Sequence, residues 1–452
     1  MKPSRKKGGG RMGEVRLPPL VEHTFPNGLH LTIARREPIP LVAARLMLEA
    51  GAAADPVDHR GLAEFTARLL RRGTRAMTAD AINDAVEFVG ASLGAGAAED
   101  YSAVSLTTPA HALERMLEVM AQLVREPAFP EVEVETARRR ALAQLANDLD
   151  DPALVADRAC ARALWGDHPY GHDVLGTARD VERFSREQSE RFHRLWYGPR
   201  IAQLFVVGAV DPDAVLRLVE RVFGSWEGGP SAPPSIPPLA KAAGAGRVLL
   251  IDKPDQTQSQ VRIGGLALRR GAPDWIPALV MNTALGGGFT SRLVNEIRVK
   301  RGLSYGAASG FDGMLAGGSF VVSTFTKTES TSEIIDVAMA ELRKMRAKGP
   351  AASELVRAQT YMAGLYPLRL ETNESVAAAL AETRLYSLGE DWVARYRERV
   401  RSVTRAQAAA AARQWLPGDD PALVVVANAS EVQAQLREWG TVDVRPLADL
   451  VS

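Results

Sequence analysis

Hydrophobic and polar positions along the chain follow two patterns, one with a period of two and one with the period of a helix. Residues 21–36 alternate apolar and polar side chains around an Asn27-Gly28 turn, which predicts a β-hairpin. Residues 41–50 continue as a third strand. The same criteria predict strands through 102–107, 201–210, 247–251, 259–268 and 422–427, and helices over 79–89, 110–126, 131–149, 211–223, 275–285 and from 431 onward.

A further helix is predicted over residues 61–74. Its apolar residues Leu62, Phe65 and Leu69 fall on one helical face, and a glycine follows them as a stop signal. Glu64 and Arg68 lie four residues apart on the opposite face, in the order that favours an ion pair worth ~0.2–0.5 kcal/mol. By itself, this pattern indicates an ordinary structural helix.

The chain divides into two similar halves. A Pro-rich stretch without periodicity begins at residue 228, and the elements after it repeat the plan of those before it. An offset of 220 residues relates Gly51 to Gly271 and Phe205 to Val425, which indicates an internal duplication. Because strand runs and helical runs are mixed rather than strictly alternating, we expect two tandem α+β halves with antiparallel-rich sheets covered by helices. The expected divisions are a disordered basic tail over 1–19, a first half over 20–227, a linker over 228–244 and a second half over 245–452.

Composition narrows the function classes only slightly. The 452 residues are 46% hydrophobic and 24% charged, with a net charge of +1, which gives no reason to expect nucleic acid or a membrane as partner. The single cysteine, Cys160, precludes an internal disulfide, and we expect it to be a buried structural thiol. No signal peptide is visible, so the expected location is cytoplasmic, with a periplasmic location left open.

The second half contains a run that is typical of a site. Gly286, Gly287 and Gly288 end one predicted helix and open a loop, and Arg298 lies in the last turn of the next helix. Tyr305 follows on an expected strand that begins at about residue 303. A guanidinium and a phenol are donors suited to a carbonyl oxygen that gains negative charge. The structural alternative is a helix-end arginine and a half-buried tyrosine; a phosphate loop is disfavoured because no Gly-Lys-Ser/Thr follows.

The helix over 61–74 resembles the metal-binding helix of the insulinase/pitrilysin zinc peptidases, which include the mitochondrial processing peptidase. In that family the motif is H-x-x-E-H, in which two histidines bind zinc and the glutamate activates water. Here the three positions read Glu64, Ala67 and Arg68, and the third ligand position of the family falls on Gln144. All four zinc-site positions are changed, so no metal or cofactor is expected in this chain.

The resemblance extends to the second half and covers about residues 20 to 440. The run with Gly286, Gly287 and Gly288 resembles the Leu-Gly-Gly-Gly signature of the family, and Arg298 and Tyr305 keep the spacing of its Arg/Tyr pair. In some family members the two half-sites lie on separate chains. The resemblance therefore implies a substrate-binding subunit, inactive alone, whose Arg298 and Tyr305 stabilise the tetrahedral intermediate in a heterodimer with an H-x-x-E-H sister subunit. Zinc is expected in that partner, and unfolded peptides are the expected substrate.

Family members bind peptides by adding a strand to an exposed sheet edge. The corresponding edge in the first half, residues 90–97, has Gly94 where the family has asparagine, and its glycines weaken a strand. We therefore do not expect this half to hold substrate.

Two other functions remain open at this level. One is a scaffold or interaction protein of peptidase fold without a proteolytic role, like the core subunits of the respiratory cytochrome complex. The other is a self-sufficient peptidase with an unrecognised site. His168 and His172 have a ligand-like spacing, but the intervening proline and glycine preclude a helix, and the loop between them recurs in the family.

Overall fold

Two mixed β-sheets form the centre of the protein, one in each half. The computed structural model describes residues 17–37, 39–238 and 246–450. Sheet 1 has the strand order β1-β2-β6-β3-β5-β4. Its strands are β1 (Leu20–Thr24), β2 (His30–Arg35), β3 (Leu41–Leu48), β4 (Ser92–Ala97), β5 (Ser102–Pro109) and β6 (Ala202–Gly208).

Sheet 2 repeats this arrangement in the second half, with the order β12-β7-β11-β8-β10-β9. Its strands are β7 (Val248–Asp252), β8 (Gln258–Ala267), β9 (Ala307–Gly313), β10 (Gly318–Lys327), β11 (Ala422–Ala427) and β12 (Val442–Pro446). In sheet 1, β6, β3, β5 and β4 are joined by three antiparallel pairings. In sheet 2, β11, β8, β10 and β9 are joined in the same way. The predicted fold class, two similar α+β halves, is confirmed.

The sequence patterns account for most of the strands. The hairpin predicted around Asn27-Gly28 is β1 paired with β2, in the register Leu20 opposite Ala34. Every residue of β6 is buried, as its continuous apolar run requires for a strand covered on both faces. The edge strands differ, because β1 is antiparallel to β2, whereas β12 comes from the end of the chain and is parallel to β7.

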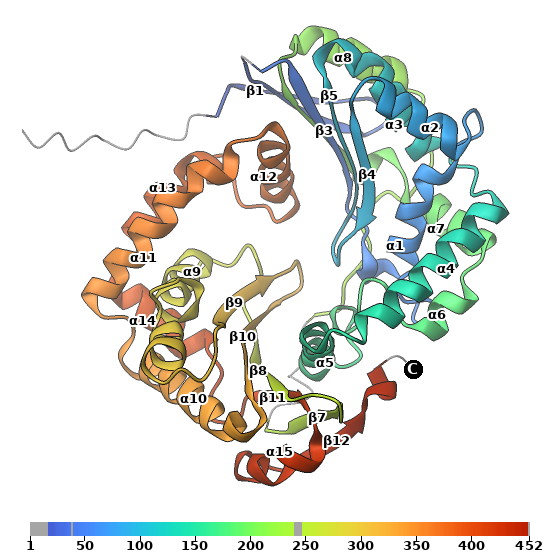
Figure 1. Ribbon diagram of the computed structural model, residues 1–452. Coiled ribbons are helices and arrows are strands. Elements are labelled where there is room, and N and C mark those ends of the chain that lie inside the picture. The colour runs from blue at the N-terminus through green and yellow to red at the C-terminus, as the bar shows by residue number, and fades with distance from the viewer. Residues whose placement is uncertain (1–16, 38, 239–245, 451–452) are drawn as a thin grey trace, which may run out of the picture.

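Helices surround both sheets (Figure 1). Those of the first half are α1 (Leu62–Leu69), α2 (Ala79–Phe88), α3 (Leu113–Arg125), α4 (Glu131–Asp148), α5 (Pro152–Trp165), α6 (Ala178–Arg183), α7 (Arg186–Trp196) and α8 (Pro212–Phe223). Those of the second half are α9 (Trp275–Asn282), α10 (Thr331–Lys348), α11 (Ala352–Leu365), α12 (Asn373–Leu385), α13 (Trp392–Ser402), α14 (Arg405–Trp415) and α15 (Ala429–Leu436). Within the described ranges, no helix is long and apolar enough to cross a membrane.

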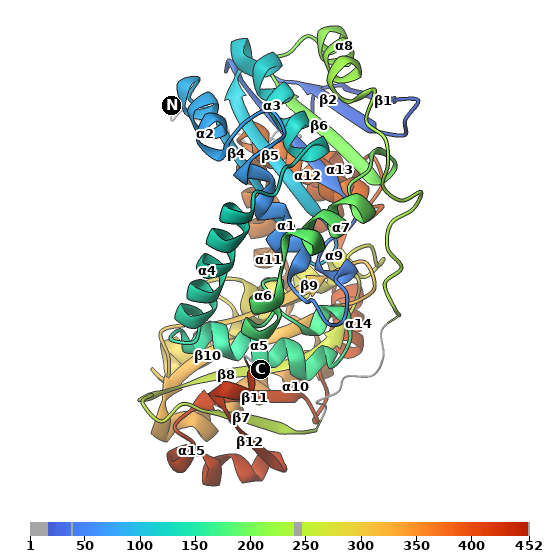
Figure 2. The same cartoon turned by 90° about the vertical axis from the view of Figure 1, so that its right-hand side faces the viewer.

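The halves exchange one helix each. Helix α5 of the first half packs on β8 and β11 of sheet 2, and α12 of the second half packs on β3 and β6 of sheet 1 (Figures 1 and 2). Polar contacts fix both helices: Arg262 donates to Ala153 O at 3.0 Å, and Asn373 donates to Leu41 O at 2.9 Å. The two helices hold equivalent places in the duplication, so each half completes the packing of the other.

A buried carboxylate adds a polar link between the halves. The phenol of Tyr170 donates to one oxygen of Asp100, and Tyr386 (3.2 Å) and the backbone N–H of Leu315 (2.9 Å) donate to the other. Tyr170 belongs to the first half, whereas Leu315 and Tyr386 belong to the second. Burial raises the pKa of Asp100, and its three donors counteract this effect.

Parts of the expected domain division lie outside the described residues. The basic tail over 1–19 is described only from residue 17, and the linker over 228–244 only as far as residue 238. Residues 228–238 contain no helix or strand. All strands of sheet 1 precede this segment and all those of sheet 2 follow it; the stated boundaries remain a prediction.

Candidate functional site

Helix α1 is fixed at its N-terminus and is buried on more than one side. The carboxylate of Asp55 accepts from the backbone N–H groups of Gly61 (2.6 Å) and Ala63 (2.7 Å), and Gly61 has the positive φ of 94° that glycine tolerates. Leu62, Phe65 and Leu69 contribute to the first-half core as predicted. The opposite side of the helix is not a solvated face, because β4 and α4 pack against it.

The side chains at the former zinc positions contact one another. Arg68 Nε donates to Glu64 Oε1 at 2.5 Å, and Arg68 Nη1 donates to Gln144 Oε1 of α4 at 2.9 Å. The second oxygen of Glu64 accepts from the backbone N–H of Ala97 at 2.5 Å, and only 8% of Glu64 is exposed. The ion pair expected between Glu64 and Arg68 is therefore present, and it is largely buried at its acidic end.

This arrangement does not fit zinc. Arg68 is a permanent cation without a lone pair for a metal, and Gln144 has a neutral amide where the family has a carboxylate. Ala67 has only a methyl group in the place of the general base. Within the described part of the chain, no three or more histidine, cysteine, aspartate or glutamate side chains gather in a group that could hold a metal ion.

Strand β4 is a regular edge strand despite its glycines. It pairs with β5 over its whole length and lies at the end of sheet 1. Gly96 leaves room for Glu64, since a Cβ atom there would lie 3.1 Å from Glu64 Oε2. Strand β4 is thus formed despite its glycines, and the hydrogen bond from Ala97 N to Glu64 holds it against α1. That this half does not hold substrate stays a prediction.

The glycine run of the second half serves close packing rather than an unusual backbone turn. A Cβ atom on Gly286 would lie 2.3 Å from Ser309 Oγ and 2.7 Å from Ser309 N. Asn282 holds the same residue of β9, donating to Ser309 O at 2.8 Å and accepting from Ser309 Oγ at 2.5 Å. Gly286 is buried, whereas Gly287 is exposed and Gly288 is half-buried.

One π-helical turn, Thr283–Gly287, includes the first two glycines of this run, and a second one follows over Val294–Lys300. Such turns are rare and occur often at functional sites. Ser291 lies at the start of the second helix, and its Oγ is buried without a hydrogen-bond partner. The pattern in the sequence predicted the helices but not their wider turns.

Arg298 and Tyr305 are both exposed. Arg298 lies in the second π-helical turn, with its guanidinium carbon 5.3 Å from the centre of the Phe289 ring. Tyr305 is 84% exposed. The expectation that it lies on a strand is wrong: β9 begins only at Ala307, and Tyr305 lies in the loop before it. Within the described ranges, no hydrogen bond or ion pair joins Arg298 to Tyr305 or to an acid.

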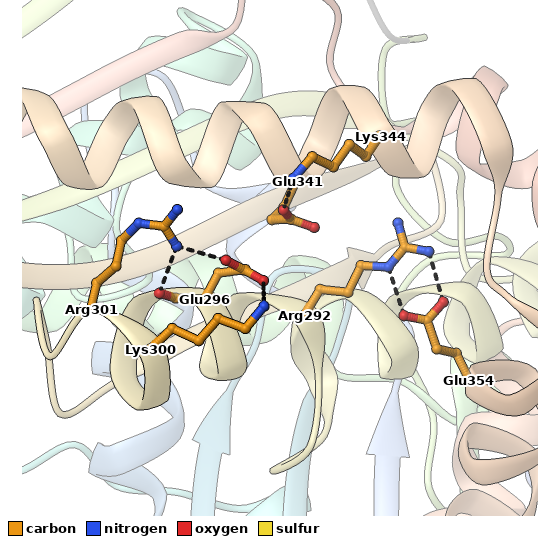
Figure 3. A network of polar contacts seen from close by, with 7 residues as sticks. All are labelled: Arg292, Glu296, Lys300, Arg301, Glu341, Lys344 and Glu354. Carbon is orange, nitrogen blue, oxygen red and sulfur yellow. Dashed lines mark hydrogen bonds and ion pairs between the residues drawn. The ribbon is translucent and has the colours of Figure 1, made fainter.

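Ion pairs fix the helix that carries Arg298 (Figure 3). Arg292 donates to both carboxylate oxygens of Glu354 on α11, at 2.8 and 2.7 Å. Glu296 accepts from Lys300 at 2.5 Å and from Arg301 at 2.6 Å, and these hydrogen bonds lower the pKa of Glu296. These basic side chains are thus neutralised by acids, unlike Arg298. The sequence did not predict that Glu354 pairs with Arg292. Its position in the first turn of α11 is the only local feature that marks it.

The remaining candidates are structural. His168 accepts from Tyr170 N through Nδ1 (3.1 Å), and its Nε2 lies 3.0 Å from Pro237 O, so both ring nitrogens have partners. Burial, followed by the nearby Arg60, lowers the pKa of His172 to about 4. Cys160 is buried as predicted, in the contact of α5 with sheet 2.

The two repeated sheets, the four altered zinc-site positions on α1 and α4, and the glycine run define a two-half α+β protein of peptidase fold. A family model described as insulinase (peptidase family M16) matches residues 31–178, and one described as peptidase M16 inactive domain matches residues 183–362. This chain belongs to the insulinase family of peptidases.

Relatives span nearly the same length. A Streptomyces coelicolor protein described as an uncharacterized zinc protease is 29% identical over 95% of this chain and 93% of its own. A Mycobacterium tuberculosis protein with the same description is 28% identical over 80% of this chain and 83% of its own.

Solved structures share the fold. A peptidase M16 inactive domain from Pseudomonas fluorescens has a TM-score of 0.85 at 24% identity and covers 95% of this chain and 99% of its own. A protease from Helicobacter pylori has a TM-score of 0.86 at 19% identity and covers 91% of this chain and 100% of its own.

Proposed function

We propose that this chain is the non-catalytic, substrate-binding subunit of a heterodimeric zinc metallopeptidase. A sister subunit with an H-x-x-E-H motif holds the zinc and activates the water. Arg298 and Tyr305 of this chain bind the peptide and stabilise the tetrahedral intermediate at the partner's metal. The family relationship and the zinc protease descriptions of its relatives support this role.

One contrast carries the proposal. In the first half, the polar groups at the altered metal site are hydrogen-bonded to one another, since Arg68 donates to both Glu64 and Gln144. In the second half, the Arg298 guanidinium lies over the Phe289 ring and has no acidic partner among the described residues, and Tyr305 is 84% exposed. Polar groups that bind a ligand are expected to be exposed in the free protein and not hydrogen-bonded to other side chains. Arg298 and Tyr305 of the second half meet this expectation.

The surface around Arg298 suits an apolar partner or peptide. Phe289 is 76% exposed and Val299 is 70% exposed. Phe289, Gly288 and Tyr361 of α11 line a pocket of about 130 Å³. The substrate contact predicted for the glycine run fits Gly288, which lines this pocket, better than Gly286, which is buried.

The chemistry of the pair matches the task. An arginine remains charged at any physiological pH, and a phenol donates a hydrogen bond without changing its own charge. Both can therefore stabilise an oxyanion without taking part in proton transfer. A single donor of this kind is worth about 10²–10³-fold in rate.

The test is reconstitution from separately purified chains. Zinc content and cleavage of an unfolded fluorogenic peptide are measured for this chain, for an H-x-x-E-H sister chain and for the mixture. The proposal expects zinc only in the sister chain and cleavage that is fast only in the mixture. Stoichiometric zinc in this chain would instead favour a self-sufficient peptidase. A stable complex whose cleavage rate equals that of the sister chain alone would favour a scaffold role.

A further inference from the structure

A large cavity lies between the two halves, and its lining does not include the glycine run. Its volume is about 580 Å³, within the range of small-molecule sites. Arg45 of β3 and Tyr101 line it from the first half; Arg270 and residues of α9, α12 and α13 line it from the second. Strand β3 and helix α12, which form part of its walls, lie side by side in Figure 1. A ligand there would contact both halves at once.

The cavity lining is positively charged. It contains Arg45, Arg270 and Arg369, against the single acid Glu382. Glu382 is already occupied, since it accepts from Arg270 Nε at 2.7 Å. The lining therefore carries an excess of positive charge that an anionic ligand would balance.

The side chain of Arg270 is fixed by its neighbours, but one of its N–H groups has no hydrogen-bond acceptor. Only 9% of it is exposed, and its guanidinium carbon lies 4.8 Å from the ring centre of Trp275 and 5.2 Å from that of Trp392. Its Nη1 is buried without a hydrogen-bond partner. Arg45 is similar, because it donates to Ser105 Oγ at 3.1 Å while its Nε is buried and unpaired. Buried, unpaired donors of this kind call for an acceptor.

The walls are aromatic. Tyr366 and Tyr396 stack with ring centres 4.0 Å apart, and burial raises the pKa of both phenols, so they stay neutral. The aromatic residues that line the cavity are Tyr101, Trp275, Tyr366, Tyr386, Trp392 and Tyr396. Such walls bind a flat apolar group by ring packing.

We infer that this cavity binds an α-carboxylate attached to an aromatic side chain, with the carboxylate on Arg270 and the ring between the tryptophans and tyrosines. A free aromatic N-acyl amino acid and the carboxyl terminus of a peptide share this chemistry. The inference does not depend on the proposed role of Arg298 and Tyr305.

The test uses the full-length chain and titration calorimetry, with the fluorescence of Trp275 and Trp392 as a second signal. The probes are N-acetyl-phenylalanine, its amide, and a pentapeptide ending in phenylalanine with a free or an amidated carboxyl group. We expect saturable binding of the acids and at least tenfold weaker binding of the amides. Binding of the small acid alone identifies a metabolite-like ligand; tighter binding of the peptide acid identifies a peptide terminus.

Two variants and a control complete the test. Arg270→Gln is expected to weaken binding of the acid at least tenfold, and Arg369→Gln, at an exposed position where folding is not at risk, threefold or more. Arg413→Gln, an exposed arginine outside the cavity, should bind like the unaltered chain. Absence of saturable binding, equal binding of acid and amide, or unchanged binding by both cavity variants would overturn the inference.

Discussion

At the scale of single residues, Arg68 is the side chain at the altered zinc site whose chemistry is least suited to a metal. It donates to Glu64 and to Gln144, and so joins the two helices that would otherwise present metal ligands. An imidazole at the same position would offer a lone pair, whereas a guanidinium offers only N–H groups. The spacing of the helix and its contact with α4 are intact, so only the chemistry of the site has changed.

Restoring the ligands should therefore restore metal binding. In a variant with Glu64→His, Ala67→Glu, Arg68→His and Gln144→Glu, we expect about one zinc ion per chain, measured by mass spectrometry of the metal, because the geometry for three ligands and a water remains. The matched control keeps Arg68 and carries the other three substitutions; it should bind none. Equal zinc in both variants, or none in either, would show that Arg68 is not the obstacle.

At the scale of elements, the helix that carries Arg298 is positioned by the glycine run. Gly286 lets the π-helical end of α9 approach β9, where Asn282 binds Ser309. The following helix is then fixed by the pair of Arg292 with Glu354. The exposed arginine thus projects from a rigid base rather than from a mobile loop.

Adding a methyl group at Gly286 should disturb this base. Gly286→Ala places a Cβ atom 2.3 Å from Ser309 Oγ, and we expect a loss of about 1–3 kcal/mol in the free energy of unfolding from overpacking. In α11, a Cβ atom on Gly364 would meet nothing within 4 Å. Gly364→Ala should therefore be neutral or stabilising by about 0.5–1 kcal/mol. Urea titration of both variants measures the difference, and equal stability of the two would refute the close approach.

The contact between α7 and α3 makes stability depend on pH. His193 donates through Nε2 to Val124 O at 2.7 Å, and burial lowers the pKa of His193 to about 4. In the unfolded chain its pKa is about 6.5, so the unfolded state binds more protons between these values. The stabilisation is complete above pH ~6.5 and is lost as the pH falls toward 4.

His193→Gln keeps a donor for Val124 O but cannot be protonated. Between pH 7.5 and 5, we expect the variant to lose about 1–2 kcal/mol less of its unfolding free energy than the unaltered chain does. All other titrating groups are shared, so the difference isolates this histidine. Parallel pH profiles from urea denaturation would contradict the assignment.

Local patterns predicted the elements better than they predicted the site. The hairpin around Asn27-Gly28 and the helix at residue 62 were predictable because turn chemistry and helical periodicity are local signals. The loop position of Tyr305 was not, since the start of β9 depends on its pairing with β10. The burial of Glu64 was missed for the same reason: it results from β4, which is distant in the sequence.

At the scale of the whole molecule, the duplication was visible in the sequence but its consequence was not. The strand orders of the two sheets match except at the edge strands β1 and β12, as the repeated pattern predicts for the rest. The local sequences of α5 and α12 do not indicate which sheet each helix packs on, because an amphipathic helix can pack on the sheet of its own half or on that of the other half. The Asp100 link and the cavity with Arg270 result from this exchange, and so could be found only in the structure.

The central claim is that this chain lacks the metal half of a peptidase site and keeps the half that stabilises the oxyanion. The most direct measurement is kcat/KM of the complex with its H-x-x-E-H sister chain when this chain carries Arg298→Ala or Tyr305→Phe, with Arg140→Ala, on an exposed helix face of the first half, as the control. We expect a loss of about 10²–10³-fold for Arg298→Ala and about tenfold or more for Tyr305→Phe, with complex formation and zinc content unchanged. Turnover equal to that of the control in both variants would contradict the account.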